Sequence, residues 1–545
     1  MIVVARDGSG DYTTIQAAVD AAITGFRAPA LIFVCRGEYH EKLHINKDNL
    51  RIMGEDTEST VLWNSDYARQ TYPDGTEKGT FLSYTMIITG SNVEMEHMTI
   101  RNDAGPGGLA GQAVAVYAAG DRVAFRHCKM IAHQDTLFCG PTMQKVCDNA
   151  LPYMLPLQST SVGDAGVSSH RQYYENCYIQ GDVDFIFGPY RCWFEGCTLV
   201  CNDRGQQING YYTAANTPNE QPYGFVFHQC HLTGNCADNS VYLGRPWRAY
   251  ARTVFLNCRM DACVKSEGWA DWAERPVTWR YGEYGTVGAR ADASQRHTGA
   301  SILTQAEAES ITLSEVLGGP DGWSPLHPAR TVFICGDSTA SSYQQDRYPR
   351  TGWGQVLSIM LPQSVFVQNE AVSGRSSKSF VNENRLYQIG HFIRPHDLVL
   401  IQFGHNDEKP DEKRATNPDT TFPQFLQKYI DAAREKEAVP ILLTPIVRRH
   451  FDAAEQLIDT HGEYAAAIRN QAQRMGIMLI DMEAKTRKMV TALGMEQSKT
   501  LYLWVAQGHR NYPAGEKDNT HLSFDGAWAY AKLVARELAP LLSPG

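Results

Sequence analysis

The sequence predicts two domains, a right-handed parallel β-helix followed by a three-layer α/β/α domain. One observation is a short strand pattern that recurs at irregular intervals through the first half of the chain. A second is the Pro- and Gly-rich stretch VLGGPDGWSPLHPAR (316–330), where this pattern ends. A third is the alternation of apolar strands with helix-like segments beyond that stretch, which is typical of a parallel sheet covered by helices.

The recurring unit of the first half is a short strand, a polar pair, a Cys or Met, and a second apolar position. It occurs as VEMEHMTI (93–100), VAFRHCKM (123–130), QYYENCYI (172–179), CWFEGCTL (192–199), FVFHQCHL (225–232) and TVFLNCRM (253–260). Strand-rich repeats that cannot each bury their own face indicate a solenoid. We therefore expect these units to be successive coils of a parallel β-helix.

The cysteines follow the same units, and 12 of the 13 lie before residue 264. On the β-helix interpretation five of them take equivalent places in successive coils and form an internal ladder of buried thiols: Cys128, Cys177, Cys197, Cys230 and Cys258. The odd count in a long chain argues against a disulfide framework. A metal site at Cys192, Cys197 and Cys201 is an alternative, but neither paired CxxC spacing nor a nearby His supports it.

The second half contains five apolar strands, TVFIC, SVFVQN, DLVLIQFG, VPILLTP and IMLIDM. Helix-like segments such as FPQFLQKYIDAAREKEA and YAAAIRNQAQRMG lie between them, so we expect a parallel sheet with helices on both faces. We place the first domain at 1–325, a linker at 326–331 and the second domain at 332–545. The length of 545 residues is compatible with two or three domains.

Composition excludes several classes of function. A net charge of −10 without a basic cluster argues against nucleic-acid binding, which depends on neutralising phosphates. No apolar run approaches the ~20 residues that span a bilayer. The opening MIVVARDGSGDYTTIQAAVDAA has neither a basic n-region nor an apolar h-region, so either the protein is cytoplasmic or a signal peptide has been trimmed. The Gly-rich GPGGLAG (105–111) lacks the context of a phosphate cradle and is expected to be a loop.

A β-helix offers long shallow clefts suited to polymers, and five polar stretches of the first half could supply chemistry there. They are GEYHEK (37–42), GQAVA (111–115), QDTL (134–137), GDVDFIFG (181–188) and LGRPW (243–247). Together with DGSGDYTTIQAAVDAA and GWADW, and in this order, they closely resemble the pectin methylesterase family from about residue 3 to about residue 325. The resemblance implies hydrolysis of galacturonate methyl esters without a metal or organic cofactor.

The resemblance also implies roles for two carboxylates and a cation. Asp184 would be the nucleophile, held ionised by Arg245. Asp135, kept protonated by its neighbour, would donate to the departing methoxide and then act as base on the water that cleaves the acyl-enzyme. The side-chain amides of Gln112 and Gln134 would stabilise the tetrahedral oxyanion.

Aromatic residues of the same stretches, Trp247 and Phe187, would stack on sugar rings. If GDVDFIFG is one strand, alternation puts Val183, Phe185 and Phe187 on one side and Asp182, Asp184 and Ile186 on the other. Asp184 then points at the cleft, whereas Asp182 is expected to be structural.

One departure from the family is the longer separation of the two aspartates. Residues 141–168 look like an insertion that emerges beside the expected cleft. We expect a loop that reshapes substrate access and favours a branched or decorated pectic region. Cys139 and Cys147 could staple this loop in an oxidising compartment.

Four blocks of the second half contain the parts of a serine hydrolase. GDST (336–339), NEAVSGRSSKSF (369–380) and FGHND (403–407) each follow a strand, and DNTHLSFDGA (518–527) lies near the C terminus. They resemble the SGNH, or GDSL-type, hydrolases over about 330–540. The residues of the four blocks look most like those of the rhamnogalacturonan acetylesterase branch. The alternative for the first block alone is that its serine caps a helix.

Carried over by position, the resemblance makes Ser338 the nucleophile, His521 its general base and Asp518 the group that orients His521. The oxyanion hole would consist of the amides of Ser338 and Gly374 and the side-chain amide of Asn406, since a residue without Cβ allows close approach to substrate. The remaining aspartates of the blocks, Asp337 and Asp407, are expected to make structural hydrogen bonds.

The sequence therefore favours a bifunctional enzyme that removes methyl and acetyl esters from a pectic polysaccharide or oligosaccharide. A polymer substrate implies a periplasmic or secreted protein. Three alternatives remain: one active domain only, a C-terminal esterase that acts on a non-pectic ester, and a pectin-binding protein without catalysis. A β-helical lyase or polygalacturonase is disfavoured, because the basic residue with calcium-binding carboxylates, or the acidic cluster with its His motif, is not found.

Overall fold

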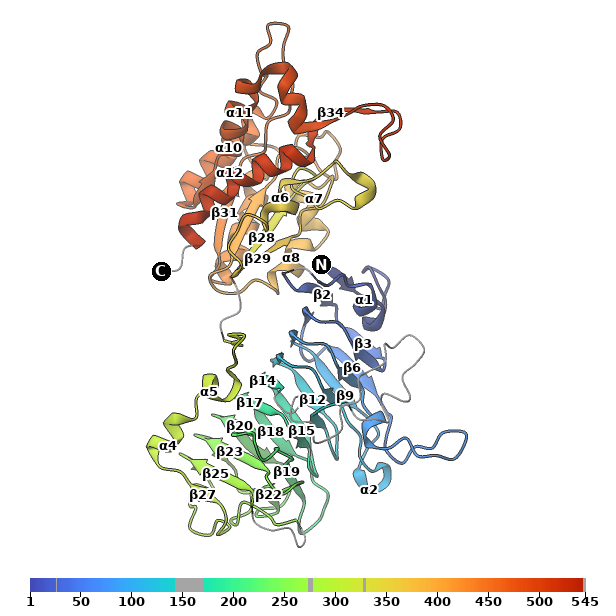
Figure 1. Cartoon of the computed structure of the whole chain (residues 1–545), viewed down its shortest axis with the longest axis vertical. Coiled ribbons are helices and arrows are strands. Elements are labelled where there is room, and N and C mark those ends of the chain that lie inside the picture. Colours follow the sequence, from blue (N-terminus) through green and yellow to red (C-terminus); the bar gives the residue numbers. More distant parts are fainter. Residues whose placement is uncertain (26, 143–169, 273–277, 327–329, 543–545) are drawn as a thin grey trace. The chain divides into compact units, whose positions relative to one another are not determined.

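The computed structural model describes residues 1–25, 27–142, 170–272, 278–326 and 330–542. The chain divides into two compact units, Met1–His327 and Pro328–Gly545 (Figure 1). Nearly all of the expected insertion, with Cys147, and the centre of the expected linker lie outside the described residues.

The first unit is a parallel β-helix, as predicted. Within the described residues its strands pair in three parallel sheets along the unit. In spatial order, the largest contains β1 (Ile2–Val4), β2 (Ala30–Val34), β5 (Leu50–Gly54), β8 (Val93–Glu96), β11 (Val123–Arg126), β14 (Arg171–Glu175), β17 (Arg191–Glu195), β20 (Phe225–His228), β23 (Arg252–Leu256), β25 (Arg280–Tyr284) and β27 (Ser301–Ile302).

The other two sheets complete each coil. One contains β22 (Val241–Gly244), β19 (Gly210–Ala215), β16 (Ile186–Gly188), β13 (Leu137–Cys139), β10 (Val116–Ala118), β7 (Met86–Ile88) and β4 (Leu43–Ile45). The other contains β26 (Val287–Gly288), β24 (Arg259–Met260), β21 (His231–Gly234), β18 (Thr198–Cys201), β15 (Tyr178–Gly181), β12 (Lys129–Ile131), β9 (Thr99–Asn102), β6 (Thr60–Asn64) and β3 (Gly37–His40).

Short helices decorate the β-helix. In the described part of the unit they are α1 (Ile15–Ala21), η1 (Thr80–Leu82), α2 (Gly107–Ala110), α4 (Gln305–Ser310) and α5 (Leu313–Leu317). The Gly-rich stretch expected to be only a loop therefore contains one helical turn, α2. The Leu and Val side chains of α5 pack against the outer face of the largest sheet.

The cysteine ladder is confirmed. At each of four consecutive steps, the residue after one cysteine donates its amide to the carbonyl oxygen of the cysteine in the preceding coil, at 2.9 Å. All five thiols are free and buried. A second interior ladder consists of aromatic rings stacked 4.4 to 5.4 Å apart: Phe125, Tyr174, Phe194, Phe227 and Phe255. These ladders keep successive coils in register, which fixes the outward residues relative to one another.

The second unit has a parallel sheet in the order β29 (Val365–Asn369), β28 (Arg330–Gly336), β30 (Leu398–Gln402), β31 (Val439–Leu443) and β32 (Met478–Ile480). All five predicted strands are present. Because β28 lies between β29 and β30, the chain order reverses at β28, and ligands bind at the carboxyl ends of strands at such a switch point.

Helices of the second unit form two groups. The first contains α6 (Trp353–Leu357), α11 (Met482–Gln497) and α12 (Phe524–Leu542), and the second contains α7 (Ser377–Asn382), α8 (Arg385–Gly390), α9 (Thr421–Glu435) and α10 (Gly462–Met475). The turns η2 (Gln345–Arg347) and η3 (Ser498–Leu501) and the antiparallel pair β33 (Tyr502–Val505) and β34 (Glu516–Leu522) complete the unit. Across the ranges that the structure describes, no helix has the length and apolar character to cross a membrane.

Candidate active sites

The first candidate site lies on the sheet that contains β13, β16, β19 and β22. Asp135 precedes β13, Asp184 precedes β16 and Arg245 follows β22, so neighbouring strands carry them to one place. A cavity of about 280 Å³ is lined by Thr80, Phe81, Gln112, Gln134, Asp135, Asp184, Phe187, Ala214, Arg245, Trp247 and Trp272. All seven site residues that were inferred for the first half therefore line this one cavity.

The two aspartates have left-handed backbone conformations, with φ of 68° at Asp135 and 51° at Asp184. Asp is one of the few residues besides Gly that adopts this region readily. The amide of Asp135 donates to the carbonyl oxygen of Val183 at 3.1 Å, which ties the two turns together. Each carboxyl group is thus presented by a tight turn between two strands.

The prediction of one continuous strand over 181–188 is wrong. β15 ends at Gly181 and β16 begins at Ile186, and the left-handed turn between them breaks the alternation. Phe185 consequently joins Ile186 in the interior core, whereas Phe187 packs with an outer aromatic cluster. Asp184 reaches the cavity because of this turn rather than because of strand alternation.

Arg245 binds Asp184 through two parallel hydrogen bonds, from Nε to Oδ1 at 2.8 Å and from Nη2 to Oδ2 at 2.7 Å. Its guanidinium carbon lies 4.0 Å from the ring centroids of both Tyr211 and Trp272. Paired hydrogen bonds fix the plane of a carboxylate, and flanking rings stabilise the cation through their negative faces. The arginine is therefore positioned from three sides.

The environments of the two carboxyl groups push their pKa values apart. Burial and then the neighbouring Asp184 carboxylate raise the pKa of Asp135 well above its usual range. Burial also raises the pKa of Asp184, but the hydrogen bonds and charge of Arg245 oppose that rise. The arrangement favours a protonated Asp135 beside an ionised Asp184.

The two glutamines of the cavity are placed by neighbouring coils. The carbonyl oxygen of Gln112 accepts from the amide of Ala68 at 2.8 Å, and that of Gln134 accepts from the amide of Ala113 at 3.0 Å. Both side chains are half-buried in the cavity lining. α2 approaches closely, because a Cβ at Gly107 would lie only 2.7 Å from Gln134 Oε1. Neutral donors of this kind suit a developing oxyanion.

Aromatic rings form one wall of the cavity. The Phe187 and Trp247 rings lie 5.8 Å apart, and both approach the ring of Phe138. Outside this wall, Asp182 is fully buried, where its carboxylate contacts His133 Nδ1 at 3.0 Å and accepts the amide of Val183 at 2.8 Å. These contacts fit the expectation that Asp182 has a structural role.

The second candidate site lies at the carboxyl end of β28. Ser338 Oγ is 2.9 Å from His521 Nε2, and His521 Nδ1 is 2.6 Å from Asp518 Oδ2. Hydrogen bonds from His521 lower the pKa of Asp518 to about 2 against the opposing effect of burial. The three groups thus have the connectivity of a catalytic triad. The helix-cap alternative for Ser338 fails, because no helix begins there in the described chain and α6 starts only at Trp353.

The inferred oxyanion donors come from three adjacent strands. Ser338 follows β28, Gly374 follows β29 and Asn406 follows β30. Gly374 has a φ of 82°, a conformation that favours glycine. Asn406 Nδ2 donates to the carbonyl oxygen of Arg375 at 3.1 Å, which links the loops that follow β29 and β30.

Two buried aspartates beside the triad have local partners. Asp337 accepts from the amide and hydroxyl of Thr339, both at 2.9 Å. Asp407 accepts from Ser377 Oγ at 2.5 Å and from the amide of Gly404 at 3.1 Å, and burial raises its pKa to about 7. Both therefore organise the loops around the triad, as expected from the sequence.

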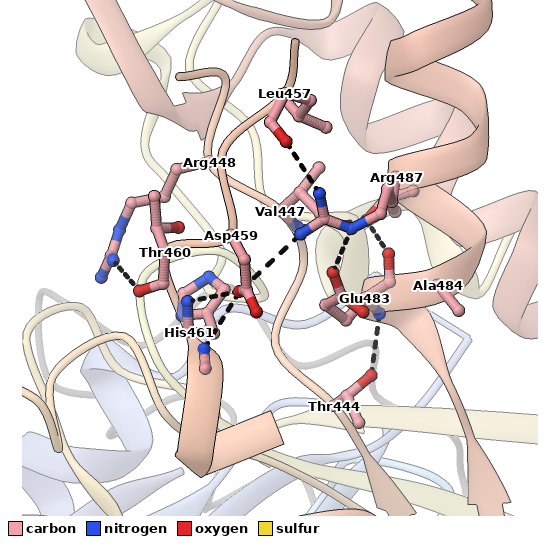
Figure 2. Close-up of polar contacts among 12 residues, drawn as sticks. Thr444, Val447, Arg448, Leu457, Asp459, Thr460, His461, Glu483, Ala484 and Arg487 are labelled. Atoms are coloured by element: carbon pink, nitrogen blue, oxygen red, sulfur yellow. Dashed lines mark hydrogen bonds and ion pairs between the residues drawn. The ribbon is translucent and has the colours of Figure 1, made fainter. Parts of the chain in front are cut away.

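A polar network supports the loop that follows β31. Figure 2 shows Arg487 between Glu483 and Asp459, with its Nη1 donating to the carbonyl oxygen of Leu457 at 3.1 Å. The Glu483 amide donates to Thr444 Oγ1 at 2.8 Å. These bonds fix both ends of the loop to α11.

The same loop holds the segment that carries Asn406. Arg448 donates to Glu408 Oε2 at 2.9 Å and to the carbonyl oxygen of His405 at 3.2 Å. His461 Nδ1 lies 2.6 Å from Glu408 Oε1. Residues on both sides of Asn406 are therefore anchored by charged groups.

Sequence reasoning missed four residues that shape the two sites. Tyr211 and Trp272 flank Arg245 in the first site. In the second, Tyr343 contacts the backbone of Ser338 and Arg350 lies over the Tyr343 ring. Trp272 belongs to GWADW, a motif that was part of the resemblance, but no role was assigned to this tryptophan. Within the described ranges, no group of three or more His, Cys, Asp or Glu residues could hold a metal ion.

Comparison with known proteins finds two families. The pectinesterase family profile matches residues 1–149 and 163–320, and the GDSL-like lipase/acylhydrolase profile matches residues 334–529. Rhamnogalacturonan acetylesterase RhgT of Bacillus subtilis is 44% identical over 39% of this chain and 91% of its own length. Pectinesterase 31 of Arabidopsis thaliana is 31% identical over 54% of this chain and 85% of its own length. The probable pectinesterase/pectinesterase inhibitor 23 of Arabidopsis thaliana is 31% identical over 59% of this chain, which spans 53% of that relative.

Proposed function

The chain belongs to the pectinesterase family and carries a second, GDSL-like acylhydrolase domain, and from this premise we propose that it removes two kinds of ester from pectic substrates. The first site hydrolyses galacturonate methyl esters, and the second hydrolyses acetyl esters on pectic or rhamnogalacturonan material. The observation that carries the proposal is the pair of unlike nucleophiles: an arginine-bound carboxylate in one unit and a histidine-bound serine in the other.

At the first site the reaction begins at Asp184. Its carboxylate attacks the carbonyl carbon of the methyl ester, and the amides of Gln112 and Gln134 stabilise the oxyanion. Asp135 gives its proton to the departing methoxide, which leaves as methanol. Asp135 then takes a proton from water, which attacks the acyl-enzyme and releases the galacturonate carboxylate and free Asp184. Arg245 keeps the nucleophile ionised in the ground state.

At the second site the reaction follows the serine esterase pattern. His521 takes the proton of Ser338 as Oγ attacks the acetyl carbonyl, and Asp518 stabilises the imidazolium that forms. The amides of Ser338 and Gly374 and the side chain of Asn406 stabilise the oxyanion. The imidazolium then protonates the sugar oxygen as it leaves, and water releases acetate from the acetyl-serine.

The substrate class also bears on where the protein works. A pectic polymer is encountered outside the cytoplasm, so we propose a periplasmic or secreted location. The aromatic wall at Phe187 and Trp247 suits stacking on sugar rings, which supports a polysaccharide or oligosaccharide as the partner.

Labelling of one nucleophile tests the assignment of two separate sites. An organophosphate should modify Ser338, which mass spectrometry of the labelled peptide locates. On pectin that carries both esters, the labelled protein should release methanol at the original rate and almost no acetate. Loss of both products together, or of neither, would contradict the proposal.

A further inference from the structure

Arg350 places a positive charge against Tyr343, a residue that contacts the backbone of the second nucleophile. The Tyr343 hydroxyl donates to the carbonyl oxygen of Ser338 at 2.6 Å, and the Arg350 guanidinium lies 4.5 Å from the centroid of the Tyr343 ring. The amide of Thr351 donates to the carbonyl oxygen of Leu522 at 3.1 Å. Arg350 is thus one ring away from the nucleophilic serine and adjoins the segment that holds the catalytic histidine.

The charge of Arg350 lies over the Tyr343 ring and is not balanced by a carboxylate of the described chain. Other arginines around this site are paired with carboxylates: Arg375 with Glu383, Arg414 with Asp411, and Arg448 with Glu408. By contrast, no carboxylate of the described chain forms an ion pair with Arg350, and its buried Nε has no hydrogen-bond partner. The residue as a whole is half-buried, so part of its surface faces solution.

The loop that carries Arg350 is also fixed in place. Asn511, from the arm between β33 and β34, donates its side-chain amide to the carbonyl oxygens of Gln345 at 2.9 Å and Tyr348 at 2.7 Å. The Tyr512 hydroxyl donates to the carbonyl oxygen of Arg347 at 2.9 Å. A preorganised cation without a carboxylate partner is what a charged substrate group requires.

We propose that Arg350 binds the carboxylate of a galacturonate unit whose acetyl group is at Ser338, an inference that rests on the proposed function. A guanidinium pairs best with a carboxylate, whose two oxygens match its planar donors. A methyl ester is neutral and offers no such pair, so a methylated unit binds poorly at the second site.

This recognition sets an order for the two reactions. Hydrolysis of the methyl ester breaks its acyl carbon–oxygen bond, releases methanol and leaves a carboxylate on the sugar. That carboxylate is the group that Arg350 binds. Methyl ester removal therefore precedes efficient acetyl ester removal from the same unit, and the product of the first site is the preferred substrate of the second.

The test uses the full-length chain with Asp184→Ala, so that methyl esters persist on the substrate. Acetate release is measured on acetylated oligogalacturonides that carry either free carboxylates or methyl esters. We expect the free acid to have a kcat/KM at least about tenfold higher. Arg350→Gln should reduce this preference to about one, mainly by raising KM for the free acid, and Arg350→Lys should restore part of it.

Arg347→Gln is the matched control, because it removes the same charge from an exposed neighbour in η2 and should keep the preference. Organophosphate labelling of Ser338 verifies that each variant retains its triad. Equal kcat/KM for the two substrates before Arg350 is changed, or a preference that survives Arg350→Gln, would overturn this inference alone. Failure to release acetate from either substrate would overturn the proposed function as well.

Discussion

Arg245 binds both carboxylate oxygens of Asp184, with Nε 2.8 Å from Oδ1 and Nη2 2.7 Å from Oδ2. The pair is largely buried, so each charge depends on the other. This relationship favours ionisation of Asp184 against the effect of burial, whereas burial and the Asp184 charge raise the pKa of Asp135 in the same cavity.

Replacement of Arg245 by Lys should therefore slow methanol release and shift its pH dependence. Lysine keeps the charge but loses the paired geometry, so we expect kcat to fall about 10²-fold or more. Because Arg245 opposes the rise in the pKa of Asp184, weakening the pair raises that pKa further. The acidic limb of the kcat/KM profile should then move to higher pH, and an unmoved limb would contradict the assignment of Asp184.

The ring of Tyr211 should contribute to the position of Arg245. It lies on one face of the guanidinium and stacks at 5.5 Å on Tyr242 of the next coil. Tyr211→Leu removes this face and should lower kcat for methanol release several-fold, at about 1 kcal/mol for a partly exposed cation–π contact. Tyr211→Phe keeps the ring and should retain most of the rate. Equal losses in the two variants would show that the hydroxyl, rather than the stacking, is what matters.

Gly107 should be required for the position of Gln134. A Cβ there would lie 2.7 Å from Gln134 Oε1 and 3.0 Å from Gln134 Cβ, so the glutamine has to move. If Gln134 is an oxyanion donor, Gly107→Ala should reduce kcat for methanol release by up to about 10²-fold. Gly108→Ala, where a Cβ meets nothing within 4 Å, is the matched control and should change the rate little. Similar rates in both variants would argue against the role of Gln134.

Replacement of Asp518 by Asn should abolish most acetate release. The pKa of about 2 keeps Asp518 ionised throughout the neutral range, where it stabilises the imidazolium of His521. Asparagine favours the wrong tautomer of the histidine, and we expect a loss of about 10³- to 10⁴-fold in kcat. Methanol release from the same protein serves as an internal control and should not change. A small effect on acetate would mean that another group orients His521.

The sequence was sufficient for the architecture because the signals there are repetitive. Equivalent cysteines in successive units indicated coils, and buried strands alternating with helix-like segments indicated the parallel sheet. Asp135, Asp184 and Arg245 could be grouped because the motifs that carry them resemble, in the same order, those of one known family. The structure brings these residues together in one cavity.

Features that depend on a single turn, or on packing between residues far apart in the chain, could not be predicted from the sequence. The left-handed conformation of Asp184 interrupts the strand that was predicted as continuous. As a result Phe185 lies in the interior core and not on the same side as Phe187. Tyr211 had no motif to mark it, and it reaches Arg245 only because β19 and β22 are neighbours. Arg350 likewise gains its place from a loop and not from a periodic pattern.

Product analysis of two variants distinguishes two independent ester hydrolases in one chain from a single active site. Methanol and acetate are measured separately on pectic material that carries both esters. Asp184→Ala should lose methanol and keep acetate release from free-acid units, whereas Ser338→Ala should lose acetate and keep methanol. Methanol release that survives Asp184→Ala, or acetate release that survives Ser338→Ala, would contradict the account.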